Sequence, residues 1–549
     1  MEKEELDILK SKDPERVKAV LDEFNSKNAN LFNFEKFHTD GQWLTLWRIV
    51  FELLTDDQLQ TLHPLCLNTV RILTRDEFAL QTNDIKSDFC LLLELARLTL
   101  GSVIVSEVKQ ETENTDSVAS LAVGNADEDT ETVVEALKCL CNLVFQSHDC
   151  RKQCVRNRTV DFIMKRVTST TQYSNSIEFY DMNLLFLITA LELSTRPRVQ
   201  IDLNGIVYLT KWLDDKLVNK ELTVEDLKIL CEVLKVLFNI TTNPDKSPNE
   251  NEIQSLHLTS VVRELIIRFG EIKNEQERAV VFHCINLLTN MSSGSLTELV
   301  VKCETTESSL SALIYEDRNV LALDIILRCL RIVLEETENT AASNKIILPV
   351  LTVLVKCARC NPVMRHYIRT VILPPLRDVS QLPEVGKELR NYLCRFLTVH
   401  ATMIRDLSAE LLFICCKENV GRMIKYTGYG NAAGLLASRG LLDCRRVENA
   451  EYSSDSEDSD TEEYKQAQSD INVIIGRYEP PKKNPLEGMS EEQKEHEAME
   501  LANLIEKLHN SGIVKPCRIG EDGKPQPIDH ILQLQEELPQ QQLNQKHKS

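Results

Sequence analysis

The sequence predicts an all-α protein whose helices stack into an armadillo/HEAT-like solenoid. Apolar residues recur three and four positions apart from Leu44 to about Leu442, while alternating β-branched runs are scarce. The chain has 549 residues, of which 42% are hydrophobic and 27% are charged, as in soluble globular proteins. A short apolar pattern also repeats along the chain, which is typical of helical repeat proteins.

The repeat is visible as several copies of one pattern that ends in a polar residue. The segment 135–142 aligns without gaps with 232–239, and 283–290 is a third copy; all three end in asparagine. A weaker copy has Thr189 in the asparagine position, and a further one upstream has Arg75 there. The four positions from 142 to 290 are about 50 residues apart, the length of a two- or three-helix HEAT or armadillo repeat.

These recurring polar residues are candidates for partner binding. A helical solenoid presents one helix per repeat along a continuous concave face. We therefore expect Asn142, Asn239 and Asn290 to line that groove, where an amide can bond the backbone of a bound peptide. An equally weighted alternative is that they cap or bond helix ends within the repeats.

The charge distribution argues against nucleic acid as a partner. The formal charge is −21, and two stretches, 107–131 and 449–464, carry most of it. Phosphate backbones are bound by lysine and arginine, so an acidic chain is a poor candidate for that role. The first stretch is rich in polar residues, and we interpret it as a solvated acidic loop inserted in the solenoid.

The apolar segments and cysteines favour a cytoplasmic protein. The N-terminus is polar and charged, unlike a secretory signal. The longest apolar run, 346–355, is too short to span a bilayer and contains Pro349, so no transmembrane segment is expected. The 17 cysteines lie within apolar helical runs, which indicates reduced core residues.

No constellation of catalytic residues is apparent, so the chain is not expected to be an enzyme or to hold a metal or cofactor. Cys357 and Cys360 form a lone CxxC pair without partners at zinc-ligand spacing. The glycine cluster 428–440 lacks the preceding strand and the lysine of a phosphate loop. We interpret it as a tight turn with close helix packing at the end of the solenoid.

The composition changes after Leu442. The solenoid is expected over 1–442, followed by a flexible acidic linker (443–489), an amphipathic helix (490–512) and a mostly disordered tail (513–549). Ser454 and Ser459 have acidic residues three positions later, the context that casein kinase II favours. Their phosphates could pair with basic residues of the last repeats. The candidates are Arg365, Arg369 and Arg377. The alternative is an unmodified, solvated spacer.

The helix beyond the linker has clear local signals. Ser490 and Gln493 form a capping-box pattern at its start. Leu501 and Ile505 lie on its apolar face, so the helix is expected to dock back on the solenoid or to bind a partner.

Several motifs resemble those of the synembryn ("resistance to inhibitors of cholinesterase") family over essentially the whole chain. They are Leu73-Thr-Arg-Asp76, the segments 136–145 and 424–434, and Asn484-Pro-Leu-Glu-Gly-Met489 with the helix that follows. The resemblance implies a cytoplasmic chaperone and guanine-nucleotide exchange factor for heterotrimeric G-protein alpha subunits. Such a protein acts in receptor signalling and is recruited to the cell cortex or plasma membrane through its partner.

The resemblance also implies roles for single residues. In this family the solenoid holds the C-terminal helix of a GDP-bound alpha subunit free of beta-gamma and stabilises the nucleotide-free state. The groove residues map onto Arg71, Arg75 and Asn142, and the phosphosites onto Ser454 and Ser459. Arg71 and Arg75, four residues apart, are expected on one helix face; alternatively they pair with neighbouring acids. From the residues alone, an armadillo-type peptide-binding adaptor without exchange activity remains the second hypothesis.

Overall fold

The computed structural model describes most of the helical part of the chain. The described residues are 3–32, 34, 41–76, 85–99, 126–169, 171–219, 221–242, 252–303, 312–336, 341–400, 402–442, 461–479, 486, 488–513, 515, 517–520 and 524–528. Ser454 and Ser459 lie outside them, as does most of the predicted acidic loop 107–131.

The chain divides into two compact units, Met1–Glu298 and Leu299–Ser549. The α-helices of the first unit are α1 (Lys3–Lys10), α2 (Pro14–Asn28), α4 (Gln42–Leu54), α5 (His63–Leu73), α6 (Ile85–Leu95), α8 (Ala126–Gln146), α9 (His148–Arg156), α10 (Thr159–Thr168), α11 (Asn175–Leu191), α12 (Gly205–Val218), α13 (Val224–Thr241), α14 (Glu252–Phe269), α15 (Glu275–Leu288) and α16 (Ser293–Leu296). Short 3₁₀ and π turns, such as Asp57–Leu62 and Arg198–Asp202, connect some of them.

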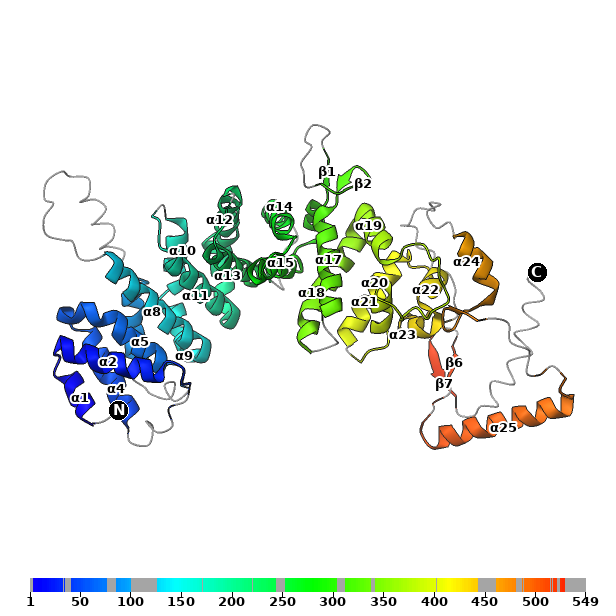
Figure 1. The fold of residues 1–549 in the computed structure, drawn as a ribbon, viewed down its shortest axis with the longest axis horizontal. Coiled ribbons are helices and arrows are strands. Elements are labelled where there is room, and N and C mark those ends of the chain that lie inside the picture. The colour runs from blue at the N-terminus through cyan, green and yellow to red at the C-terminus, as the bar shows by residue number, and fades with distance from the viewer. Residues whose placement is uncertain are drawn as a thin grey trace. The chain divides into compact units, whose positions relative to one another are not determined.

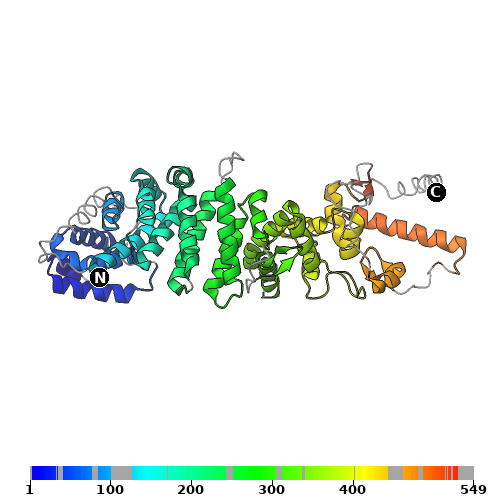
Figure 2. The ribbon, with the colours of Figure 1, turned by 90° about the horizontal axis from the view of Figure 1, so that it is seen from above.

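Two rows of helices build the first unit. Helices α5, α8, α11, α13 and α15 pack in succession, and we call these five the inner helices. Helices α10, α12 and α14 form a second row against them (Figure 1). Figure 2 shows the helices of this unit following one another in chain order, from blue to green. This arrangement confirms the predicted helical solenoid.

Helix α13 illustrates why these segments become buried helices. Its start is fixed by a capping box, in which Thr223 Oγ1 accepts from the Asp226 amide and Asp226 accepts from the Thr223 amide. Apolar residues on several sides of the helix, including Leu234, Val236 and Leu237, are fully buried because neighbours pack on both flanks. A helix with this pattern is stable only between two others.

The second unit continues with helices and adds short antiparallel ribbons. Its elements are β1 (Val301–Lys302), β2 (Ile314–Tyr315), β3 (Arg318–Asn319), α17 (Leu321–Glu336), α18 (Ala341–Cys360), α19 (Pro362–Ile372), α20 (Leu389–Phe396), α21 (Thr402–Cys415), α22 (Val420–Thr427), α23 (Tyr429–Arg439), α24 (Glu462–Ala467), β4 (Ile471–Asn472), β5 (Arg477–Tyr478), α25 (Glu491–Asn510), β6 (Cys517–Ile519) and β7 (Pro525–Pro527). The strands pair in the order β1-β3-β2, β4-β5 and β6-β7.

The segment 461–478, predicted to belong to a flexible linker, instead docks on the end of the solenoid. The amides of Tyr429 and Gly430 donate to the carbonyls of Val473 (3.0 Å) and Ile474 (2.8 Å). The Tyr478 amide donates to the Val379 carbonyl at 2.7 Å. The linker expectation is therefore wrong for this part, because backbone groups of the solenoid end supply partners that composition alone does not reveal.

Two further boundaries differ from the prediction. Helix α8 begins at Ala126, so the last six residues of the expected loop 107–131 are helical. The tail expected to be mostly disordered contains the β6–β7 ribbon, with Ile528 buried after it.

Most of the described cysteines are placed as the sequence predicts, as reduced residues of the core. The described cysteines are free thiols, and most are buried. Burial raises the pKa of Cys66 and of Cys154 to about 12, so both stay protonated at neutral pH. Within the described residues, each helix is too short or too polar to cross a lipid bilayer.

The glycine cluster explains how the segment 461–478 docks. Gly428 has φ +75°, and a Cβ there would lie 2.9 Å from the carbonyl carbon of Ile475. We expect Gly428→Ala to destabilise the second unit by about 1–3 kcal/mol, through backbone strain and this clash. Thermal unfolding and hydrogen exchange of the Tyr429 and Gly430 amides measure the effect.

The matched control is Gly434→Ala in the middle of α23. A Cβ at Gly434 meets no atom within 4 Å, so this change should be neutral or stabilising by up to about 1 kcal/mol. Equal stability and equal amide protection in both variants would contradict the docking role of Gly428.

Candidate partner-binding surface

The inner helices carry the predicted asparagines and Arg71. Arg71 lies on α5, Asn142 on α8, Asn239 on α13 and Asn290 just after α15. Because these helices pack in succession, residues at the same phase lie along neighbouring positions of one surface.

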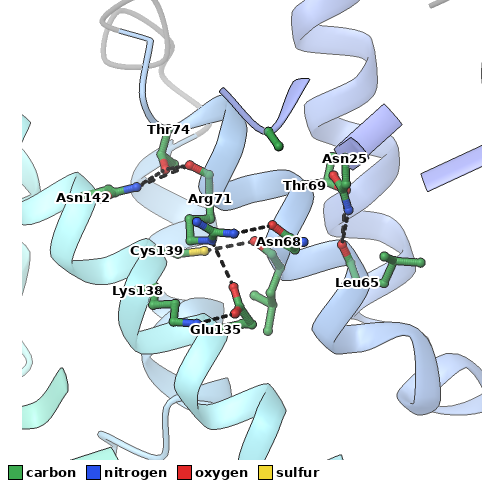
Figure 3. A network of polar contacts seen from close by, with 12 residues as sticks. Asn25, Leu65, Asn68, Thr69, Arg71, Thr74, Glu135, Lys138, Cys139 and Asn142 are labelled. Atoms are coloured by element: carbon green, nitrogen blue, oxygen red, sulfur yellow. Dashed lines mark hydrogen bonds and ion pairs between the residues drawn. The ribbon is translucent and has the colours of Figure 1, made fainter. Parts of the chain in front are cut away.

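The Asn142 side chain is bonded to the preceding inner helix. Its Nδ2 donates to the Arg71 carbonyl at 3.3 Å and to Thr74 Oγ1 at 3.2 Å (Figure 3). Thr74 Oγ1 in turn donates to the Arg71 carbonyl at 2.9 Å. The amide therefore satisfies polar groups at the C-terminal end of α5, which would otherwise lack helix partners.

The same contact recurs between later helices. Each asparagine donates from Nδ2 to a threonine hydroxyl and to the carbonyl three residues before that threonine. The sets are Asn239 with Thr189 (3.0 Å) and Phe186 (3.2 Å), and Asn290 with Thr241 (3.1 Å) and Phe238 (2.8 Å). We call these three contacts the asparagine–threonine bridges.

The bridges show where the Nδ2 donors of these asparagines bond within the protein. They link α8, α13 and α15 to the inner helix before each, rather than serving their own repeat. Partner binding by the asparagines stays a prediction. Thr189 is an acceptor of a bridge rather than a substitute for asparagine, so its alignment in the sequence pattern was wrong. Asn142, which is only partly buried, uses Nδ2 in its bridge, and its Oδ1 can accept from a partner.

A row of ion pairs follows the same surface. Glu135 on α8 accepts from Arg71 Nε at 3.1 Å and from Lys138 Nζ at 2.6 Å (Figure 3). On α13, Glu232 accepts from Lys235 Nζ at 2.6 Å and from Asn183 Nδ2 at 3.2 Å.

The lysines of this row also face aromatic rings on α11. Lys138 Nζ lies 5.3 Å from the centroid of the Tyr180 ring, and Lys235 Nζ lies 4.4 Å from that of Phe186. These glutamates and lysines were not among the predicted site residues. The signal was present, because Glu135 and Glu232, like Lys138 and Lys235, occupy matching positions in the aligned repeats.

Arg71 and Arg75 were expected on one helix face, but only Arg71 lies in a helix. Helix α5 ends at Leu73, so Arg75 lies in the turn beyond it. Arg75 Nη1 donates to the Ala29 carbonyl at 2.6 Å, and its guanidinium lies 5.3 Å from the exposed Phe32 ring. Burial, with the charge of Arg71, lowers the pKa of Arg75.

Of the neighbouring acids with which these arginines could pair, Glu77 lies outside the described residues. Arg71 pairs with Glu135, which is distant in sequence. Asp76 accepts from the Phe34 amide at 2.8 Å.

One of the candidate phosphate-pairing residues, Arg377, lies next to a contact made by Thr461. Arg365 and Arg369 are on α19, and Arg377 follows it. Thr461 Oγ1 donates to the carbonyl of Leu376, the residue before Arg377, and Thr461 caps α24. Two residues after Ser459, the chain is therefore fixed beside Arg377.

Lys425 adds a further cation to this region. Its ammonium lies 4.5 Å from the ring centroid of Tyr464, a buried residue of α24. Burial raises the pKa of the Cys416 thiol, and the charges of Arg369 and Lys425 both oppose that shift.

The helix that carries Leu501 and Ile505 is present as expected. Ser490 and Gln493 form the capping box of α25. All residues of α25 are described, and none of them is buried. Leu501 is 58% exposed, so its apolar side chain is available to a partner.

Comparison with known proteins identifies the family. The family model described as "Guanine nucleotide exchange factor synembryn" matches residues 66–524. "Chaperone Ric-8" of Drosophila melanogaster is 57% identical over the full length of both chains. "Chaperone Ric-8A" of Xenopus tropicalis is 35% identical over 96% of each chain. Among solved structures, a designed armadillo repeat protein covers 53% of this chain and 95% of its own, at 9% identity and a TM-score of 0.33.

The matches extend over the inner helices, the docked segment 461–478 and helix α25 alike. On this full-length similarity, the chain belongs to the synembryn (Ric-8) family of chaperones and guanine nucleotide exchange factors.

Proposed function

We propose that this protein is a folding chaperone and guanine-nucleotide exchange factor for heterotrimeric G-protein alpha subunits. It binds the GDP-bound subunit free of beta-gamma and holds the C-terminal helix of that subunit along the inner helices. Family membership supports the class of activity. The observation that carries the proposed binding mode is the row of partly buried ion pairs on α5, α8 and α13.

This row suits a polar or acidic helical peptide. The side chains of Arg71 and Lys138 are 28% and 26% exposed, so their charges are accessible without being fully solvated. Both share Glu135, and an incoming carboxylate can recruit either cation while the other continues to neutralise the glutamate. Charge-assisted hydrogen bonds of this kind are stronger than neutral ones.

Exchange in this proposal is a binding effect rather than bond chemistry. The protein binds the nucleotide-free conformation of its partner more tightly than the nucleotide-bound one. By linkage, it then lowers the nucleotide affinity of the partner by the same coupling free energy. Pulling the C-terminal helix of the partner away loosens its nucleotide pocket, and the same hold on a half-folded subunit is the chaperone activity.

The C-terminal segments complete the proposal. Helix α25 presents Leu501 and Ile505 to the nucleotide-binding domain of the alpha subunit. Casein kinase II phosphorylates Ser454 and Ser459, and their phosphates pair with Arg365, Arg369 or Arg377. The protein acts in the cytoplasm and reaches the cell cortex through its partner.

The first prediction concerns the two arginines. Replacing Arg71 and Arg75 together by alanine removes charged contacts worth about 1–3 kcal/mol each, so binding should weaken by about tenfold or more. Affinity for a panel of GDP-bound alpha subunits and the rate of GDP release from each measure the effect.

The control replaces two lysines outside the inner helices, Lys211→Ala on α12 with Lys273→Ala in the loop before α15. Both side chains are exposed, so affinity should stay within about twofold. An arginine double variant that folds normally and binds as tightly as this control would rule out the proposed site.

The second prediction concerns phosphorylation. Because the chain is fixed at Thr461, a phosphate on Ser459 has few residues of slack between it and Arg377. Treatment with casein kinase II should raise the rate of GDP release, by a smaller factor at high salt. Ser454→Ala with Ser459→Ala should abolish the increase; equal rates in treated and untreated protein would mean that the acidic run is a solvated spacer.

The third prediction separates exchange factor from passive adaptor. A chain ending at Met489 keeps the docked segment 461–478 and loses α25. If the protein is an exchange factor, the alpha subunit should release GDP more slowly with this truncated chain than with the full chain. The truncated chain should still bind a peptide copied from the C-terminal helix of the alpha subunit.

A full-length variant provides the matched test, because truncation also removes the tail. Leu501→Asp with Ile505→Asp should act like the truncation, whereas Asn503→Asp on the exposed polar side should not. Unchanged GDP release in both the truncated chain and the leucine–isoleucine variant would favour the adaptor.

A further inference from the structure

A cavity of about 230 Å³ lies within the first unit, where α10, α11, α12 and α13 meet. It is distinct from the bridges and ion pairs of the proposed binding surface. Its lining combines aromatic, acidic and apolar side chains. The polar and aromatic residues that matter are Arg166, Tyr173, Glu178, Asp181, Trp212 and Asp215.

The only arginine of this lining is already engaged. Arg166 Nη1 donates to both carboxylate oxygens of Asp181, at 3.1 and 3.0 Å. Its Nη2 donates to the Ala96 carbonyl, and the guanidinium lies 5.9 Å from the Tyr173 ring centroid. The negative charge of Asp181 is therefore balanced by Arg166. Burial raises the pKa of Asp181 to about 6, and the charge of Arg166 opposes that shift.

Glu178 has no such partner. Its Oε2 is shielded from solvent and has no hydrogen-bond partner in the described part of the chain. Burial raises the pKa of Glu178, while the charge of Lys216 opposes that shift. Lys216 itself is bound to Asp226 at 2.7 Å. A buried acceptor without a donor is costly, so this carboxylate is suited to a donor that arrives from outside.

Two other side chains fit the same kind of donor. Trp212 lines the cavity, and its ring attracts cations, since Lys216 Nζ lies 5.1 Å from its centroid. Aromatic side chains beside carboxylates bind ammonium and guanidinium groups. The exposed Asp215 supplies a second negative charge on the lining.

We propose that this cavity binds an organic cation, a guanidinium or primary ammonium group on a short aliphatic chain. Glu178 bonds the cationic head, Trp212 covers it and Asp215 attracts it. The volume is below the range usual for drug-sized ligands and suits a head group with a few methylenes. Two sources supply this chemistry: a free amine, or the arginine or lysine side chain of a bound polypeptide.

Tryptophan fluorescence of the full chain tests the proposal. Trp43 and Trp47 are fully buried in α4, so Trp212 is the tryptophan that a ligand can reach. Titration with agmatine should give a saturable change in emission, and Trp212→Phe should remove that change. Isothermal calorimetry on the same samples measures binding independently of the fluorophore.

The acidic residues provide matched variants. Glu178→Gln keeps the shape and removes the charge, and should weaken agmatine binding at least tenfold. Asp215→Asn, at an exposed position that folding tolerates, should weaken it by a smaller factor. Asp214→Asn removes an equal charge from the same helix, but Asp214 pairs with His257 at 2.7 Å and does not line the cavity. It should leave binding unchanged.

A second ligand distinguishes the sources. An N-acetylated, C-amidated Gly-Arg-Gly peptide carries the same guanidinium on a polypeptide; tighter binding than agmatine indicates a partner side chain, and weaker binding a free amine. The absence of saturable binding by both ligands would overturn the proposal. So would an agmatine affinity that is equal in wild type, Glu178→Gln and Asp215→Asn, because the gap would then be only a hydrated space between repeats.

Discussion

The asparagine–threonine bridge between successive inner helices is the contact on which the candidate surface depends. Each asparagine amide bonds a backbone carbonyl near the C-terminal end of the preceding inner helix. A buried amide that lost these acceptors would carry a cost of about 1–3 kcal/mol, so sliding of one repeat past the next is disfavoured. The bridge thus helps to set the register between α5 and α8, between α11 and α13, and between α13 and α15.

The fixed register places the charged side chains in line. Glu135 and Glu232 precede their bridge asparagines by the same number of residues, as do Lys138 and Lys235. Because α8 and α13 share this spacing, their ion pairs lie at matching positions on the two helices. The proposed binding mode uses this row of charges, because it requires one conformation of the partner to be bound more tightly than another.

The docked segment 461–478 changes how the C-terminal region works. A wholly flexible linker would let α25 explore a wide volume, at low effective concentration near any captured partner. Backbone bonds from Tyr429, Gly430 and Val379 instead fix this segment on the solenoid end. Gly428 and Gly476 make that contact possible, since a Cβ on Gly476 would lie 3.0 Å from the Gly428 Cα.

The sequence by itself determined the class of fold, the repeat, the capping box of α25 and the family. These features depend on local periodicity and on short motifs, such as Ser490 with Gln493, which can be identified without knowing the tertiary contacts. Only the tertiary structure decided where the Asn142 amide donates, that Arg75 lies beyond α5, and that Glu178 Oε2 has no donor among the described residues. Each of these depends on groups tens of residues away in the chain. Hydrophobic spacing fixes which face of a helix is buried, but the bonding partner of a polar side chain depends on which neighbour lies against it.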